Sequence, residues 1–391
     1  MDAAPADRDR KGPLAGLTVV ELAGLGPVPL AGLMLAEMGA RVVRIERPTN
    51  DRAFLRLPPQ YDLDRHGREI LTVDLKRPEG AELVLRLIER ADALIEGFRP
   101  GVMERLGLGP EIACARNPGL IYGRLTGYGQ TGPLAPRAGH DLTYLAYSGA
   151  LHAIGHKDSR PVPPLNLVAD YGGGTMMLIS GLLAALFERS RSGTGQVIDA
   201  SMVEGASMLA APYFGFMAAG IWRERRGDNL LDSGTPFYDT YETADSRHIA
   251  VACLEPHFFA EFARLLPLDA RFVAAQYDRN VWDDMRAAIA EQVARKSRDE
   301  WTAIFEGTEA CVAPVLSFSE AASHPHSQAR EGHVDAGGFM RPRPAPRFSR
   351  TTTEPSCAPS GGACDAGSIL ARFGISEAEA AALAKDGIVG K

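Results

Sequence analysis

The sequence predicts an α/β protein, with a large domain built on a mostly parallel sheet covered by helices and a small α+β domain. Three observations support this fold class. Short runs rich in Val, Ile and Leu alternate with helix-like segments through the first half of the chain, as in parallel βαβ units. Within residues 238–253, two segments of alternating apolar and polar residues flank a turn, which predicts two antiparallel strands. The length of 391 residues is more than one domain usually spans.

The composition is that of an ordinary globular protein, with 45% hydrophobic and 23% charged residues. A net charge of −7 argues against a nucleic-acid partner, which usually requires a basic surface. The five cysteines show no CxxC spacing and predict free thiols in a reducing compartment. We expect a cytoplasmic protein that does not enter a membrane. Residues 1–12 have the composition of a disordered tail rather than a signal peptide, and no uncharged apolar run is long enough for a membrane span.

The large domain is predicted to begin at residue 13 and to run to residue 225. Its expected strands lie at 17–22, 41–45, 71–75, 93–96, 120–125 and 195–199, and its longer helices at 28–39, 78–91, 141–151, 171–189 and 200–219. Helical crossovers between parallel strands bring the carboxyl ends of the strands to one edge, where ligands tend to bind. Gly24 and Gly26 resemble the start of a dinucleotide-binding turn, but a GxG without a third glycine is weak support.

Three basic residues, Arg47, Lys76 and Arg99, follow the ends of predicted strands. Such residues are most often solvated surface charges. The alternative is a phosphate-binding rim, in which arginine binds through its planar fork and lysine as a point charge. The sequence pattern by itself leaves both interpretations open.

A histidine and an aspartate, His140 and Asp170, each arrive on a short turn before a predicted helix. Groups of this kind can transfer protons if they face each other. Asp141 could orient the imidazole of His140 or cap the helix that it begins. Asp170 could likewise be a helix N-cap, because a helix starting with three glycines follows it.

The small domain is predicted at 226–330, after a polar, Gly-rich linker. Its strands are expected at 238–243 and 248–253, and its helices at 256–266, 280–295 and 299–306. Glu255 directly follows the second strand and is either a surface charge or a carboxylate delivered to a cleft between domains. Residues 331–391 are predicted to cross back without regular structure and to end in a helical pair that completes the large domain.

A series of motifs along the chain occurs in the same order in one enzyme family. The motifs are Val42–Pro48, Val73–Lys76, Arg99–Glu104, Gly127–Pro133, Gly139–Asp141, Pro164–Leu167, Asp170 with Gly172–Gly174, and Leu254–Pro256. From about residue 13 to residue 384 the chain therefore resembles the α-methylacyl-CoA racemases of the family III CoA-transferase superfamily. The joint occurrence of His140, Asp170 and Glu255 favours the racemase branch. In the transferase branch an aspartate matching Asp170 is a nucleophile, which is the alternative function.

The resemblance implies a Rossmann-like large domain built from both ends of the chain, with the small domain inserted between them. It also implies a homodimer in which the two subunits interlock. The active site would then lie between the large domain of one subunit and the small domain of the other. The expected partner is an acyl-CoA, which is part of the substrate, and neither a metal nor a redox cofactor is expected.

The resemblance further implies that His140 and Asp170 transfer protons on opposite faces of the α-carbon of a 2-methylacyl-CoA. Asp141 and Glu255 would orient the imidazole of His140. The full set implied for proton transfer is His140, Asp170, Glu255, Asp141, Asn166 and Tyr238. The set implied for CoA binding is Arg47, Val73, Asp74, Leu75, Lys76, Arg99, Gly139, Leu142, Thr143 and Tyr144.

Overall fold

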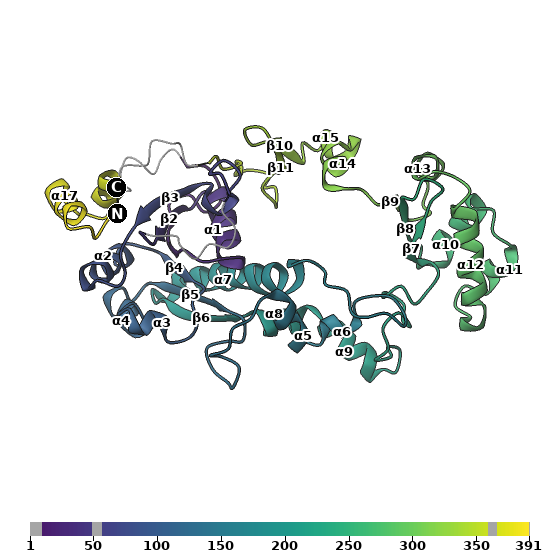
Figure 1. Ribbon diagram of the computed structural model, residues 1–391, viewed down its shortest axis with the longest axis horizontal. Coiled ribbons are helices and arrows are strands. Elements are labelled where there is room, and N and C mark those ends of the chain that lie inside the picture. Colours follow the sequence, from purple (N-terminus) through teal and green to yellow (C-terminus); the bar gives the residue numbers. More distant parts are fainter. Residues whose placement is uncertain (1–9, 49–56, 359–365, 391) are drawn as a thin grey trace. The chain divides into compact units, whose positions relative to one another are not determined.

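The computed structural model describes residues 10–48, 57–358 and 366–390 (Figure 1). Most of the predicted N-terminal tail, residues 1–9, therefore lies outside the described residues. Contacts divide the chain into two compact units. We call them the large unit, residues 1–148, 165–209 and 325–391, and the small unit, residues 149–164 and 210–324.

The observed units depart from the predicted boundaries, because residues 149–164 and 210–225 group with the small unit. Hydrogen bonds explain this grouping. Arg226 donates to the backbone oxygens of His152 and Ser159, which ties the two segments together. A Cβ on Gly227 would also lie 2.2 Å from the backbone nitrogen of Lys157, so the chain approaches closely there.

A six-stranded sheet organises the large unit, in the order β3-β2-β1-β4-β5-β6, and every pairing is parallel. The strands are β1 Thr18–Leu22, β2 Arg41–Glu46, β3 Arg68–Thr72, β4 Ala93–Glu96, β5 Ile121–Thr126 and β6 Gln196–Ser201. This sheet confirms the predicted α/β class. The third strand was predicted three residues too late, and Val73 instead forms an isolated bridge with Val389.

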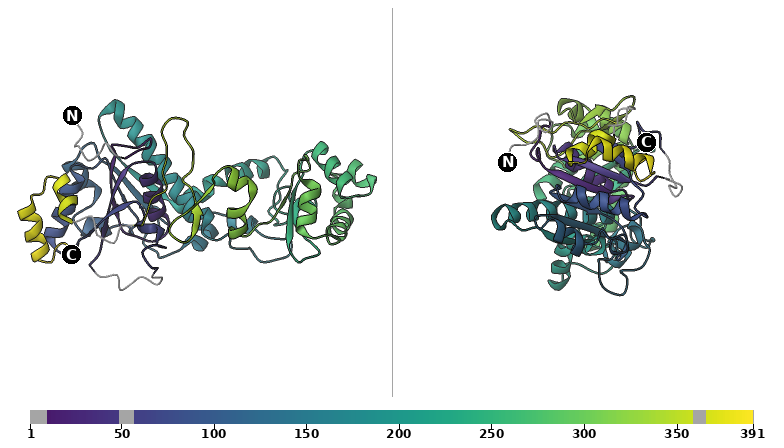
Figure 2. Two further views of the ribbon diagram at one scale, coloured as in Figure 1. Left: turned by 90° about the horizontal axis from the view of Figure 1, so that it is seen from above. Right: turned by 90° about the vertical axis from the view of Figure 1, so that its left-hand side faces the viewer.

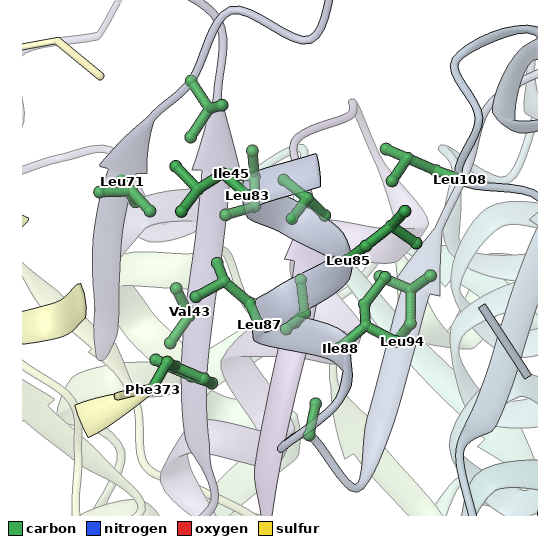
Figure 3. Packing of buried hydrophobic residues seen from close by; sticks show 14 of the residues in the cluster. Val43, Ile45, Leu71, Leu83, Leu85, Leu87, Ile88, Leu94, Leu108 and Phe373 are labelled. Carbon is green, nitrogen blue, oxygen red and sulfur yellow. The ribbon is translucent and has the colours of Figure 1, made fainter. Parts of the chain in front are cut away.

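The large unit also contains helices, and several of them pack against its sheet. They are α1 Pro27–Glu37, α2 Pro78–Ile88, α3 Val102–Arg105, α4 Pro110–Arg116, α5 Asp141–Tyr147, α7 Met176–Ser192, α8 Met202–Leu209, α15 Pro325–Ala329, α16 Ala366–Arg372 and α17 Glu377–Lys385, with a short 3₁₀ turn at Leu63–Arg65. Figures 1 and 2 show the C-terminal helices, in yellow, beside α2. Their apolar side chains join those of α2 in one buried cluster. Figure 3 labels Val43, Ile45, Leu71, Leu83, Leu85, Leu87, Ile88, Leu94, Leu108 and Phe373 of this cluster. The predicted C-terminal helical pair is thus confirmed.

Buried charges lie in the large unit between α1 and the sheet. The carboxylate of Glu21 accepts hydrogen bonds from Arg44 and, at 3.2 Å, from Arg68. The side chains of Glu21 and Arg68 are fully buried. Gly32 of α1 makes room for this group, because a Cβ there would lie 2.0 Å from Glu21 Oε2. A buried carboxylate facing two guanidinium groups holds charge in the interior only because it is paired.

The return crossing contains more regular structure than predicted. Strands β10 His333–Asp335 and β11 Met340–Pro342 form an antiparallel hairpin. Arg341 donates to Glu37 Oε1 at 2.6 Å, and both residues are buried. This ion pair anchors the crossing to the end of α1.

The small unit is an α+β structure around an antiparallel sheet in the order β7-β8-β9, which confirms the predicted antiparallel strands. Its strands are β7 Tyr238–Glu242, β8 His248–Ala252 and β9 Val312–Pro314. Its helices are α6 Ala150–Ala153, α9 Ala211–Ala218, α10 Pro256–Leu265, α11 Ala270–Ala274, α12 Trp282–Val293, α13 Arg298–Phe305 and α14 Phe318–Ser323, with a 3₁₀ turn at Arg279–Val281. The predicted linker before β7 is an ordered loop. In it Asp232 accepts hydrogen bonds from the backbone N–H groups of Gly227, Asn229 and Gly234.

One helical segment, Leu167–Ser192, is long and apolar enough to cross a membrane by length and composition. In the structure this segment packs on β5, β6 and α8. Its buried side chains, which include Leu178 and Leu182, belong to that packing. Such packing is typical of a helix that covers a sheet.

Candidate active site

His140 stands immediately before α5, at the end of a Gly-rich loop. It has the extended backbone of an N-cap residue, with φ −139° and ψ 171°. Its N–H group donates to Thr143 Oγ1 at 3.0 Å, and that hydroxyl donates to the backbone oxygen of His140 at 2.8 Å. The residue is exposed. The start of α5 thus fixes the backbone of His140 and presents its imidazole to solvent.

Asp141, the first residue of α5, is 5% exposed. Its Oδ2 accepts hydrogen bonds from the backbone N–H groups of Ala169, at 2.9 Å, and Asp170, at 2.8 Å. This geometry does not support the implied role of Asp141, which was to orient the His140 imidazole. In the described part of the chain, the hydrogen bonds of this carboxylate go to the peptide that carries Asp170.

Asp170 lies inside a helix, and the interpretation as an N-cap is wrong. A π-helical segment spans Leu167–Thr175 and continues into α7. The three glycines after Asp170 therefore lie within the helix rather than at its start. One of them, Gly173, meets α8 closely, since a Cβ on Gly205 would lie 1.8 Å from its backbone oxygen. Wide turns of this kind occur often at functional sites.

The carboxylate of Asp170 has neighbours on several sides. Asn166 Nδ2 donates to its Oδ2 at 3.3 Å, as the resemblance implied for the support of Asp170. A Cβ on Gly26, in the turn after β1, would lie 3.3 Å from the same oxygen, and its φ of +73° suits glycine. Burial raises the pKa of Asp170, the Asn166 hydrogen bond lowers it, the charge of Asp141 raises it and that of His140 lowers it, with a net rise.

Tyr144 lies in the same region of the large unit. It is 9% exposed, and a Cβ on either Gly127 or Gly139 would lie within 2.4 Å of its ring. Burial raises its pKa to about 12, with the charge of Asp170 adding to the rise and that of Arg99 opposing it. The phenol is therefore close enough to both charges to interact with them. No sequence pattern indicated that Gly127 and Gly139 leave the space that the Tyr144 ring occupies.

The predicted CoA rim lies at the carboxyl ends of the strands. Arg47 follows β2, Lys76 follows β3 and Arg99 follows β4, and all three are exposed. The guanidinium of Arg47 lies 5.9 Å from the centre of the Phe98 ring. The position of these residues at one edge is confirmed, because all the strands are parallel. Their contact with a phosphate stays a prediction.

The remaining residues of the implied CoA set divide into two groups. The side chain of Val73 is fully buried and that of Leu75 is partly buried against the core, so their implied contacts with CoA stay predictions. Asp74 accepts a hydrogen bond from the Lys76 N–H at 3.1 Å and thereby shapes the loop. By contrast, Leu142 and Thr143 are exposed beside His140, where a ligand could reach them.

Glu255 and Tyr238 belong to the small unit, and their implied contacts with His140 and Asp170 stay predictions. Glu255 is the exposed N-cap of α10. The turn before it is held by Gln276 Nε2, which donates to the backbone oxygens of Cys253 and Leu254 at 3.2 and 2.9 Å. Gln276 is 4% exposed. No sequence pattern points to Gln276, because a glutamine in a short turn has no distinguishing spacing.

The described residues contain no cluster of three or more His, Cys, Asp or Glu suited to a metal ion. Four cysteines, Cys114, Cys253, Cys311 and Cys357, are free, in line with the prediction, and Cys364 lies outside the described residues.

Comparison with known proteins gives this site a family context. The model of CoA-transferase family III matches residues 14–363. The chain belongs to this family. As a family III member it is 45% identical to the α-methylacyl-CoA racemase of Mus musculus, over 96% of this chain and 97% of the relative. It is 44% identical to the racemase of Homo sapiens, over 88% of each chain.

Solved structures of family III proteins share the fold. A CAIB/BAIF family protein from Brucella suis matches with a TM-score of 0.76 at 29% identity, over 90% of this chain and 96% of that protein. The family resemblance read from the motifs is confirmed.

Proposed function

We propose that this family III enzyme is an α-methylacyl-CoA racemase, which moves the α-proton of 2-methylacyl-CoA thioesters between the two faces of the α-carbon. The observation that carries the proposal is the pairing of an exposed histidine and a half-buried carboxylate in one site. His140 and Asp170 are joined there through Asp141. The identity of 44–45% to racemases supports the same activity.

In the proposed reaction, ionised Asp170 removes the α-proton and the electron pair of the C–H bond passes into an enolate. Protonated His140 then donates a proton to the opposite face of the carbon. The reverse turnover starts from neutral His140 and protonated Asp170. The raised pKa of Asp170 favours this exchange, because an acid/base group works best with a pKa near the working pH. The scheme itself calls for no metal or redox cofactor.

Exposed leucines near the site support an apolar acyl group. Leu25 adjoins Gly26, Leu142 adjoins Asp141, and Leu165 and Leu167 flank Asn166. Their exposed fractions are 65%, 44%, 64% and 55% in that order. Apolar side chains in such positions favour a hydrocarbon chain over a small polar acid.

Incubation with one enantiomer of a 2-methylacyl-CoA in D₂O tests the function. We expect α-deuterium incorporation and formation of the other epimer, without any added carboxylate. The measurement is mass spectrometry together with chiral separation of the released acid. If no deuterium enters, and CoA instead passes to an added carboxylate, the enzyme is a transferase with Asp170 as its nucleophile.

We further propose that two copies of the chain form the interlocked homodimer that the resemblance implies, and that Glu255 of one copy acts on His140 of the other. An apolar surface at the β6 edge of the large-unit sheet supports this proposal, because a partner subunit could cover it. There β6 exposes Val197, and α7 exposes Leu183 and Phe187, with 66% of Phe187 accessible. Exposed apolar side chains in one region commonly mark an interface.

Subunit complementation tests this arrangement. Asp170→Asn and Glu255→Gln homodimers are each expected to lack racemase activity. A heterodimer obtained by co-expression with two different tags has one unmodified site if the two residues come from different copies. Regained activity in the purified heterodimer supports a shared site, whereas its absence argues that each copy builds its own site.

A further inference from the structure

We propose that Asp141 is a positioning residue for Asp170 rather than for the neighbouring His140. It would act by holding the peptide N–H groups of Ala169 and Asp170. This inference rests on the proposed racemase function, in which Asp170 is one of two proton-transferring groups. It assigns to Asp141 a role different from the one implied by the family resemblance.

The hydrogen-bond geometry supports this assignment directly. One oxygen of Asp141, Oδ2, accepts both N–H groups at 2.9 and 2.8 Å. Hydrogen bonds to an ionised acceptor are stronger than neutral ones. The other oxygen, Oδ1, is buried and has no hydrogen-bond partner among the described residues. Among the described residues, the hydrogen bonds of this carboxylate thus come only from the backbone N–H groups of Ala169 and Asp170.

The backbone of the π-helical segment explains why such an acceptor is needed. In a helix with i→i−5 hydrogen bonds, the first N–H groups have no acceptor within the helix. Ala169 and Asp170 are the third and fourth residues of the segment Leu167–Thr175, so their N–H groups belong to this set. Ala169 is fully buried, and a buried N–H group without an acceptor is costly. Asp141 supplies the acceptor from α5.

The other contacts around Asp170 have different roles. Asn166 contacts the carboxylate itself, and Thr175 Oγ1 donates to the backbone oxygen of Pro27 at 2.7 Å, which holds the far end of the segment. Asp141 links Asp170 to the helix that begins directly after His140. Asp141 therefore contributes to the spacing between the two proton-transferring groups, together with the packing of α5 and the π-helical segment on α8.

The link also has an electrostatic consequence. The groups that interact with the Asp170 carboxyl are Asn166, Asp141, His140 and Tyr144. Burial is the largest cause of its raised pKa, and the negative charge of Asp141 adds to the rise. Removing that charge should therefore lower the pKa of Asp170.

Two variants separate the effect of the hydrogen bonds from that of the charge. Asp141→Ala removes the acceptor, so we expect α-deuterium exchange from the enantiomer whose proton Asp170 takes to fall about 100-fold, the cost of a misplaced catalytic group. Exchange from the other enantiomer, through His140, should fall much less. Asp141→Asn keeps an acceptor oxygen, so we expect a small loss of rate and an acid limb of the pH–rate profile displaced to lower pH.

The control is Asp269→Asn, which alters a carboxylate that accepts an N–H group at the start of α11 in the small unit. It should leave both exchange rates and the pH profile unchanged. An equal loss from both enantiomers in Asp141→Ala, with no change of the pH profile in Asp141→Asn, would overturn the assignment.

Amide hydrogen exchange of residues 167–175 keeps this inference separable from the function. Protection of the Ala169 and Asp170 amides should drop in Asp141→Ala, whatever reaction the wild-type enzyme catalyses. Unchanged protection would overturn the positioning role. Absence of racemisation by the wild-type protein, with protection lost in the variant, would refute the proposed function alone.

Discussion

Replacing Asp170 with asparagine is expected to lower racemisation about 10³-fold or more, near the upper range for loss of a general acid/base. Asparagine has nearly the same size, so the spacing to Gly26 is kept, and its side-chain oxygen can still accept from Asn166. The variant loses only the group that takes and returns the proton. The rate of epimer formation measured by chiral separation checks this expectation.

Deuterium exchange from each enantiomer distinguishes the two-base scheme from a single base. In Asp170→Asn, exchange should survive for the enantiomer whose proton His140 removes, and should vanish for the other. His140→Ala should give the opposite pattern. A control, Asp158→Asn, changes a surface carboxylate with 76% of its side chain exposed and should behave as wild type. Loss of exchange from both enantiomers in each site variant would contradict the scheme.

Replacing Glu21 with glutamine is expected to reduce the free energy of unfolding by about 3–5 kcal/mol, the usual cost of breaking a buried ion pair. The variant leaves Arg44 and Arg68 facing a neutral group in the interior, and the close approach of Gly32 leaves little space for rearrangement. Arg44 keeps its ion pair with Glu46 at 3.1 Å, but the buried Arg68 loses the carboxylate that it pairs with.

Urea denaturation followed by circular dichroism measures this loss. The matched control is Glu82→Gln, which removes a surface ion pair to Arg116 and should change the free energy of unfolding by less than about 1 kcal/mol. Equal free energies of unfolding for Glu21→Gln and Glu82→Gln would contradict this expectation, because the buried ion pairs would then contribute no more than a surface pair.

Periodicity predicted most of the large unit because its strands contain short apolar runs that are buried on both faces, such as Ala93–Ile95 in β4. The same rule misplaced β3, which begins with Arg68 and Glu69. These side chains are buried through tertiary ion pairs, with Glu69 contacting Arg41 and Arg372. A pattern that assigns charged residues to the surface cannot locate such a strand.

The candidate site was predicted from motifs rather than from local physics. Asp170 was as consistent with a helix cap as with catalysis, and a lone histidine such as His140 is more often structural than catalytic. Their proximity depends on contacts across nearly thirty positions. The start of the π-helical segment was missed because Leu167 and Val168 continue an extended, Pro-rich stretch. The partners of Asp141 are two backbone N–H groups, which no side-chain pattern reveals.

The C-terminal helices have a consequence for how the chain is made. Their residues Ile369, Leu370 and Phe373 complete the cluster that buries α2, and Arg86 meets Glu379 across 293 positions. Contacts this distant in sequence slow folding. During synthesis the apolar face of α2 leaves the ribosome long before its covering helices exist. Newly made chains therefore expose this apolar face until the residues of α16 and α17 have been added.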